Sequence, residues 1–496
     1  MIVVAHNACG GTSEKREEAG SLAALGMTTR KTKTSFYPVA ALDPMERRRA
    51  GWFTALLLIV NFVGDGWSGR PIGLAHQLLL LPFTIGFLLS VWQLLFASEK
   101  EGMPVWWSPD KALRLTLLFE VLFLLLFAYE CHHFAPLGYR LHLFLALAIF
   151  IPLLIFLGGL ASRPPRSPTW IFAVVLTAYI AGMILAIVSF PLTYLRSDML
   201  PVIQWADTNV LHRISPYATM HVGDRIYDFP YLPGMLVAFF PFVAAHLDIR
   251  FGSIVYVAAS AALIFWAARM ERRHEVAVLL GLFLLCPFLQ YRHELYLPPH
   301  WFTLAAIYVL MQRRHFAWAA LVFGVSMAIY QFSWILFPFF LLNAVRRRGW
   351  LEPIKLTLLA ALGSLAVAGP FLVSATRRIA NNTVGQWGLM AHAEAMPINL
   401  SYWVTYLIRP DKLLRLQAAL MVAIFVYCFV RKGCTTLEDT LRWSIVALTV
   451  FTLFNVLVDG YFYLMLLVPM LIYTCVANGW WGEPGQSAFP DSAVKE

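Results

Sequence analysis

The chain has 496 residues, of which 59% are apolar and only 13% are charged. A soluble globular protein carries about 25% charged residues, so this chain has too little charge to cover a water-exposed surface. Continuous apolar stretches recur along most of its length, without the alternation of a membrane β-barrel. They predict an all-α, polytopic transmembrane helical bundle.

The net charge of +10 has a membrane explanation. Lys and Arg gather at the cytoplasmic loop ends of any protein with several spans. The sequence holds no soluble module that combines basic and aromatic residues. Nucleic-acid binding is therefore not expected.

Residues 1–50 are polar and mixed in charge, and they lack the apolar core of a secretory signal peptide. We predict a disordered cytoplasmic tail that ends at the basic cluster Arg47–Arg49.

Apolar segments then follow one another, and several are shorter than the ~20 residues of a perpendicular span. We expect about 13 spans, because 51–64, 333–345 and 398–409 are short enough to be tilted, half-inserted or joined to neighbours. The segments are 51–64, 71–97, 112–129, 140–161, 170–195, 231–247, 252–269, 276–291, 297–312, 316–331, 333–345, 354–376, 398–409, 414–430, 440–458 and 460–478.

Clusters of basic residues indicate which loops face the cytoplasm. Segment 170–195 then runs outward, and 196–230 lies on the non-cytoplasmic side. One conflict remains: if 231–247 and 252–269 both span, Arg272 falls outside. Either 231–247 is re-entrant or the Arg272 cluster breaks the rule. The clusters are Arg47–Arg49, Arg163 with Arg166, Arg272 with Arg273, Arg313 with Arg314, Arg346–Arg348, and Arg431 with Lys432.

The external loop 196–230 concentrates polar chemistry. It carries Asp198, Asp207, Asp224 and Asp228 together with His, Arg and Tyr side chains. Asp198 follows an apolar helix at the membrane–water boundary, where partial burial would raise the pKa of its carboxyl group and make it a better base. The alternative is that Asp198 only caps or solvates a helix end.

A pattern in this region resembles a known family. An Asp follows an outward helix, an SPY segment comes next, and Tyr-x-Pro opens the following helix; the matching residues are Asp198, Ser215, Pro216, Tyr217, Tyr231 and Pro233. The later stretch GVSMAIYQFSWILFPFFLLNAVRRR is similar to a helix pair that precedes a basic loop in that family. It departs from the family pattern at Gln331, which stands near the position where the family usually has a Lys. The stretch DGYFYLMLLVPMLIY resembles its last span. Together they resemble the integral-membrane GT-C glycosyltransferases, above all the polyprenyl-phosphomannose-dependent mannosyltransferases.

The resemblance implies an inverting transfer from a polyprenyl-phosphate-sugar, a lipid-linked co-substrate, without a further cofactor. One carboxylate would deprotonate the acceptor hydroxyl. Asp198 matches the family's catalytic aspartate, and Asp207 is the second candidate. For the acceptor or sugar we expect Tyr217, His221 and Tyr231.

The leaving phosphate needs cations or hydrogen-bond donors, and Arg suits phosphate through its planar fork. Each candidate has the alternative of snorkelling or binding lipid headgroups. The Arg377–Arg378 pair opposes the positive-inside trend. The external candidates are Arg292, His293, His300, Arg377, Arg378 and His392.

A metal site is not expected. His293 and Glu294 are adjacent and point different ways on a helix, and the spacing of HExxH is absent. The six cysteines form no CxxC pair, so neither a zinc site nor a disulfide framework is expected.

The sequence thus predicts a cytoplasmic tail over 1–50, an N-terminal transmembrane addition over 51–169, a GT-C-like core over 170–478 and a cytoplasmic tail over 479–496. The expected partners are a polyprenyl-phosphate-sugar, a lipid-linked or cell-envelope glycan acceptor and the bilayer. The expected location is the bacterial inner membrane, with both termini in the cytoplasm. The sugar expected is a hexose such as mannose.

Other functions stay open. A transporter or flippase of lipid-linked sugars would need charges along a path through the membrane, which are sparse here. A membrane scaffold would tolerate replacement of Asp198. An acyltransferase would need a membrane-embedded His with a polar partner, and His142 has no obvious one.

Overall fold

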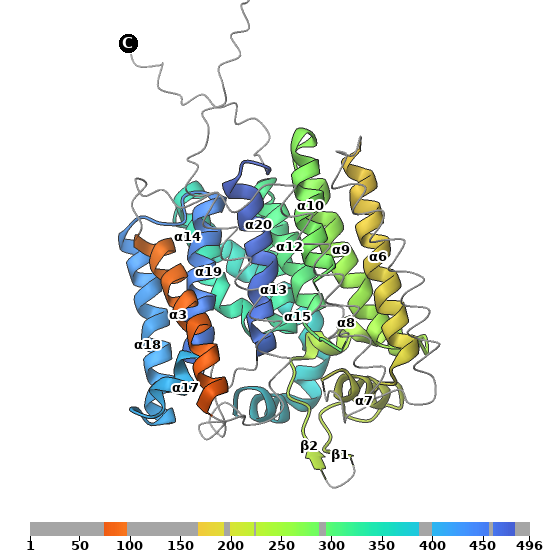
Figure 1. The fold of residues 1–496 in the computed structure, drawn as a ribbon. Helices are drawn as coiled ribbons and strands as arrows, with labels where there is room; N and C mark the ends of the chain where they lie inside the picture. The colour runs from red at the N-terminus through yellow and green to blue at the C-terminus, as the bar shows by residue number, and fades with distance from the viewer. Residues whose placement is uncertain are drawn as a thin grey trace, which may run out of the picture. The chain divides into compact units, whose positions relative to one another are not determined.

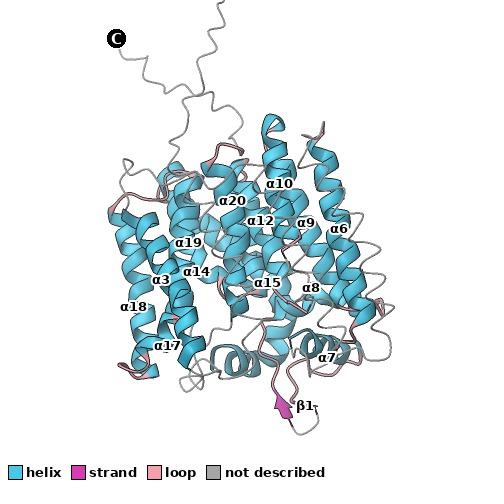
Figure 2. Cartoon of the chain, viewed as in Figure 1, coloured by secondary structure: helices cyan, strands magenta, loops and turns pink. Residues whose placement is uncertain are grey.

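The computed structural model describes residues 74–96, 167–192, 199–222, 225–286, 294–385, 399–455 and 460–481. Nearly all of them are helical, as Figure 1 and Figure 2 show. Four helices among them are long and apolar enough to cross a membrane: Pro168–Ser189, Arg250–Ala267, Glu352–Thr383 and Asp411–Val430. The predicted helical class is therefore confirmed, but the count of about 13 spans is not. The predicted segments 51–64, 112–129 and 140–161 lie outside the described residues.

The elements follow the predicted apolar segments closely from residue 168 onward, with one departure: the predicted loop 196–230 contains a helix over Met199–Leu211, most of whose apolar side chains are buried. In the first half they are α3 (Leu74–Phe96), α6 (Pro168–Ser189), α7 (Met199–Leu211), β1 (Met220–Val222), β2 (Arg225–Tyr227), α8 (Pro233–Ala244), α9 (Arg250–Ala267), η2 (Met270–Arg272), α10 (Arg273–Leu284) and α12 (Pro298–Gln312). They continue with α13 (Phe316–Ile329), α14 (Ser333–Arg348), α15 (Glu352–Ile379), η3 (Ala380–Gly385), α17 (Leu400–Val404), α18 (Pro410–Val430), α19 (Leu437–Phe454), η5 (Gly460–Leu466) and α20 (Leu467–Ala477). Of the short segments, 398–409 is not a span, since its helix α17 has only 5 residues.

Proline marks the start of many of these helices. It fits the first helical turn because the N–H that it lacks has no partner there, and its fixed φ suits a helix. Helix α19 instead begins with Thr436, whose side chain accepts a hydrogen bond from the Asp439 N–H. The prolines at the first or second position of a helix are Pro168, Pro233, Pro298, Pro353 and Pro410.

Apolar side chains cover the outside of the longest helix. On α15, Leu351, Ile354, Leu358, Leu362 and Leu365 recur every three or four residues and are 55–82% exposed. Such spacing places them on one face. A contiguous apolar face of this kind marks an interaction with lipid or protein rather than with water, in keeping with a helix that crosses a membrane.

The basic loops meet at one end of the bundle, which we call the arginine end. The Arg348 guanidinium donates to the Arg314 carbonyl oxygen (2.9 Å) and Arg346 donates to the Phe429 carbonyl at the end of α18 (2.9 Å). At the same end of the helices, the Arg269 N–H donates to the Trp480 carbonyl (2.8 Å). Helix α7 and the β1–β2 hairpin lie at the opposite end, which we call the α7 end (Figure 1).

A buried arginine joins α6 to α9 at the α7 end. Arg250, the first residue of α9, is 1% exposed. Its guanidinium donates to the carbonyls of Phe190 (2.7 Å) and Ile187 (3.2 Å) at the end of α6, and to the carboxylate of Asp248 (2.9 and 2.6 Å). Helix α9 therefore begins where α6 ends.

This contact resolves the conflict over segment 231–247. Helix α8 has 12 residues, or about 18 Å at 1.5 Å per residue, too short for the ~30 Å hydrocarbon core. Tyr231 before it packs against Tyr296, and the chain after it leads to Arg250, so both ends of α8 lie at the α7 end. Segment 231–247 does not span, and Arg272 joins the arginine end.

Helices α13 and α15 pack at glycines. A Cβ added at Gly363 would lie 2.2 Å from the Leu321 carbonyl oxygen, and one at Gly324 would lie 1.9 Å from the Ala360 carbonyl oxygen. Both contacts are to backbone, which cannot swing aside. Small residues thus let these two helices approach closely, as is common in membranes.

We expect Gly363→Ala to lower the free energy of unfolding by about 1–3 kcal/mol, the usual cost of overpacking. Gly369→Ala on the same helix is the matched control, because a Cβ there meets nothing within 4 Å. The control should be neutral or stabilising by up to about 1 kcal/mol through helix propensity. Thermal unfolding in detergent measures both variants, and equal melting temperatures would contradict the packing described.

Candidate functional site

Helix α7 carries a buried carboxylate. Its buried positions recur every three or four residues, and Leu200, Ile203 and Asp207 share that stripe. Asp207 is 0% exposed, and among the residues that the structure describes neither carboxylate oxygen has a hydrogen-bond partner. An acidic side chain therefore occupies a position that an apolar residue would normally hold.

Burial sets the protonation of this group. Because burial disfavours the charged form, it raises the pKa of the Asp207 carboxyl group to about 8. A carboxylate with such a pKa near neutral pH is suited to take a proton from a hydroxyl. Such perturbed groups gather at functional sites, although the same burial also costs stability.

Four tyrosines form a continuous series from the loop after α7 into the bundle, which we call the tyrosine row: Tyr217, Tyr231, Tyr296 and Tyr330. The Tyr217 hydroxyl donates to the Tyr231 carbonyl oxygen (3.2 Å), and Phe229 lies between their rings. The Tyr231 ring packs against the Tyr296 ring in a tilted arrangement, with the centroids 4.7 Å apart. The hydroxyls of Tyr296 and Tyr330 are 3.5 Å apart.

The tyrosine row ends at a buried histidine. The His300 ring lies 5.0 Å from the Tyr330 ring between centroids. Its Nδ1 is 3.3 Å from the Ser326 hydroxyl and 3.2 Å from the Ser333 hydroxyl, and these hydroxyls are 2.8 Å apart. Its Nε2 has no hydrogen-bond partner in the described ranges. The histidine thus ties α12 to α13 and α14 through hydroxyl groups.

The tyrosine row presents both the apolar faces and the hydroxyl groups of its rings. This combination suits a ligand that has an apolar part and hydroxyl groups. Tyr217 is 1% exposed, whereas Tyr231 is only partly buried. Tyr231 is therefore the member of the predicted acceptor set that a ligand at the α7 end reaches first. The side chain of His221, the third member, lies outside the described residues.

The structure describes three of the predicted phosphate-binding residues. Arg377 and Arg378 are exposed near the end of α15, whereas His300 is fully buried. Helix α15 begins at the arginine end, where Arg348 and Glu352 form an ion pair (3.3 Å), so its two C-terminal arginines lie toward the opposite end. The predicted residues Arg292, His293 and His392 lie outside the described residues.

The first catalytic candidate, Asp198, also lies outside the described residues. Among those that the structure describes, no group of three His, Cys, Asp or Glu side chains is placed to hold a metal ion.

Sequence reasoning missed Tyr296, Tyr330, Ser326 and Ser333. Tyr296 lies between the predicted residues Arg292 and His300, and the other three lie in the stretch GVSMAIYQFSW, which was considered for its resemblance to a helix pair. Their signal was the recurrence of hydroxyl-bearing residues beside apolar helix ends. Only the pairing of α12 with α13 and α14 shows that they converge.

No family model matches the chain, and neither the curated proteins nor the solved structures include one with significant similarity to it. The functional argument therefore rests on the residues themselves.

Proposed function

We propose that this protein is an inverting glycosyltransferase embedded in a membrane. It moves a hexose, mannose in the first instance, from a polyprenyl-phosphate-sugar to a hydroxyl of a lipid-linked or cell-envelope glycan acceptor. The observation that carries the proposal is Asp207, a buried carboxylate at the same end of the bundle as the tyrosine row. It has no hydrogen-bond partner within the described part of the chain, and burial raises its pKa to about 8.

In the proposed reaction the acceptor oxygen attacks the anomeric carbon of the donor sugar. The acceptor proton passes to a carboxylate, the bond between the anomeric carbon and the phosphate oxygen breaks, and polyprenyl phosphate leaves. Asp207 fits the base because its pKa lies near the working pH. Asp198 is the position that the resemblance to the GT-C enzymes assigns to the same role.

The arrangement of charges supports one orientation in the membrane. Positive loops favour the cytoplasm, so we propose that the arginine end faces it. The α7 end then faces the non-cytoplasmic side. Arg377 and Arg378, exposed toward that end, are the described cations that fit the leaving phosphate.

The proposal is tested with purified protein in nanodiscs, a radiolabelled polyprenyl-phosphate-mannose or polyprenyl-phosphate-glucose donor, and a lipid extract as acceptor. We expect wild type to transfer label and Asp207→Asn to lose at least about 100-fold in rate, the usual share of a general base. Asp198→Asn is measured beside it. The matched control is Asp228→Asn, since Asp228 is exposed in the same loop and bonds only to Thr219 (3.1 Å) among the described contacts.

The outcomes separate the alternatives. Loss of transfer in Asp198→Asn alone keeps the enzyme but moves the base to Asp198. Transfer that neither substitution lowers contradicts a carboxylate base in this loop. Movement of the donor across the bilayer of sealed proteoliposomes, without transfer of label in nanodiscs, would favour a flippase of lipid-linked sugars.

A further inference from the structure

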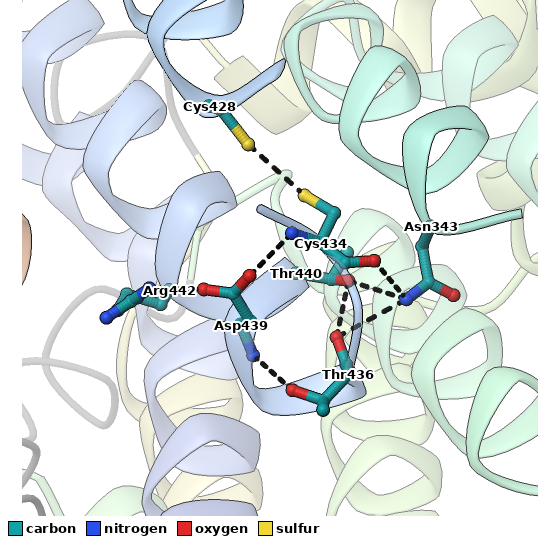
Figure 3. Close-up of polar contacts among 7 residues, drawn as sticks. All are labelled: Asn343, Cys428, Cys434, Thr436, Asp439, Thr440 and Arg442. Carbon is teal, nitrogen blue, oxygen red and sulfur yellow. Dashed lines mark hydrogen bonds and ion pairs between the residues drawn. The ribbon is translucent and has the colours of Figure 1, made fainter. Parts of the chain in front are cut away.

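Two buried cysteines face each other in the connection between α18 and α19. The sulfur atoms of Cys428 and Cys434 are 3.5 Å apart, and both residues are 0% exposed. Both are free thiols. Figure 3 shows their side chains pointing toward one another across the turn. The spacing of these cysteines in the sequence gave no sign of this contact, because the chain reverses between them.

The backbone holds the pair in place from both sides. The Gly433 N–H donates to the Cys428 carbonyl oxygen (2.8 Å), which closes the end of α18. The Cys434 N–H donates to the Asp439 carboxylate (2.5 Å), and the Asn343 side-chain amide donates to the Cys434 carbonyl oxygen (2.9 Å). Helices α14, α18 and α19 thus all fix the turn that carries the second sulfur (Figure 3).

Glycine is needed at the centre of this turn. A Cβ at Gly433 would lie 2.7 Å from the Cys428 sulfur and 2.6 Å from the Trp443 indole nitrogen. The absence of a side chain there lets the two sulfurs approach. Trp443 and Ala447 of α19 and Phe339 of α14 enclose the pair in a small apolar cluster.

We propose that Cys428 and Cys434 are an oxidisable dithiol, which a peroxide converts into a disulfide that fastens the end of α18 to the start of α19. One thiolate attacks a peroxide oxygen, which gives a sulfenic acid and releases water. The second thiol attacks that sulfur, forms the S–S bond and releases a second water. Two thiols are oxidised and one hydrogen peroxide is reduced to two waters.

The distance suits this step. A disulfide needs the sulfurs about 2 Å apart, so each sulfur moves by less than about 1 Å from its present place. The turn lies at the arginine end, and Arg431, Lys432 and Thr435 next to the two cysteines are exposed. If that end faces the cytoplasm, as proposed above, the resting state is the dithiol.

Oxidation should be slow. The hydrogen bond with Cys428, and then burial, raise the pKa of the Cys434 thiol. The thiolate is the reactive form, so the pair responds to sustained exposure to peroxide rather than to a brief pulse.

The test uses the full-length protein in detergent, purified with reductant, desalted and treated with hydrogen peroxide. It is then denatured, alkylated and digested without reduction for mass spectrometry. We expect one pair of peptides joined through Cys428 and Cys434. Its mass should be that of the two thiol peptides minus two hydrogen atoms, and dithiothreitol should return the separate thiol peptides. The buried cysteines Cys286 and Cys475 are internal controls and should be recovered in the alkylated form.

A second readout is the melting temperature, which should rise on oxidation of wild type but not of Cys434→Ser. Two results overturn the proposal: full alkylation of both cysteines after prolonged peroxide treatment, or their conversion to sulfinic or sulfonic acid without a crosslink. The mass measurement is made on wild type, so a variant that fails to fold does not weaken it.

Discussion

Asp207→Asn should make the protein more stable relative to wild type as the pH rises from about 4 to about 8. The folded protein holds the proton of Asp207 up to about pH 8, whereas the unfolded chain releases it near pH 4. Between these values the unfolded state binds fewer protons, so wild type loses stability with rising pH. The amide titrates in neither state and loses nothing.

The expected size is large. One pKa unit corresponds to about 1.4 kcal/mol, so the difference between variant and wild type should grow by up to about 4 kcal/mol between about pH 5 and pH 8. Melting temperatures in detergent at several pH values measure it. Asp228→Asn, at an exposed position, is the control and should follow wild type. A difference that does not change with pH would show that Asp207 is not buried as described.

Arg250→Met should lower the free energy of unfolding by about 3–5 kcal/mol, the usual cost of breaking a buried ion pair. The substitution leaves the carbonyls of Ile187 and Phe190 without their donor, and it leaves Asp248 without its cation. Arg250→Lys keeps the charge but not the planar fork that reaches all three groups. The free energy of unfolding of Arg250→Lys should therefore lie between those of wild type and Arg250→Met.

Arg409→Met is the matched control for this prediction. Arg409 pairs with Asp411 at 3.3 Å, but its side chain is 81% exposed. An exposed pair contributes about 0–1 kcal/mol. Equal losses in the two variants, measured by unfolding in detergent, would mean that Arg250 does not join α6 to α9.

The positions of the helices along the chain could be predicted from the sequence, but the set of side chains that meet at the candidate site could not. Apolar runs and initial prolines gave the starts of α6, α8 and α12 within a few residues, because both signals are local. The re-entrant character of 231–247 was open, since it depends on the contact of Arg250 with α6, some 60 residues away in the chain.

The site was predicted only in part for the same reason. Asp207, Tyr217 and Tyr231 lie close to one another in the sequence, in or next to the polar segment 196–230. Tyr296, Tyr330 and the serines around His300 come from separate helices, and only packing brings them together. Burial likewise distinguishes Asp207 from Asp228, which is exposed although both are acidic residues of one polar segment.

The most direct test of the proposed function is the pH dependence of sugar transfer by the wild-type protein. Purified protein in nanodiscs is given labelled polyprenyl-phosphate-mannose and a lipid acceptor, and the initial rate is followed from about pH 6 to about pH 9. If Asp207 is the base, the rate rises with pH and levels off near the pKa of about 8, and Asp207→Asn shows no such rise. A rate that is flat or falls over this range, or no transfer at any pH, would contradict the account.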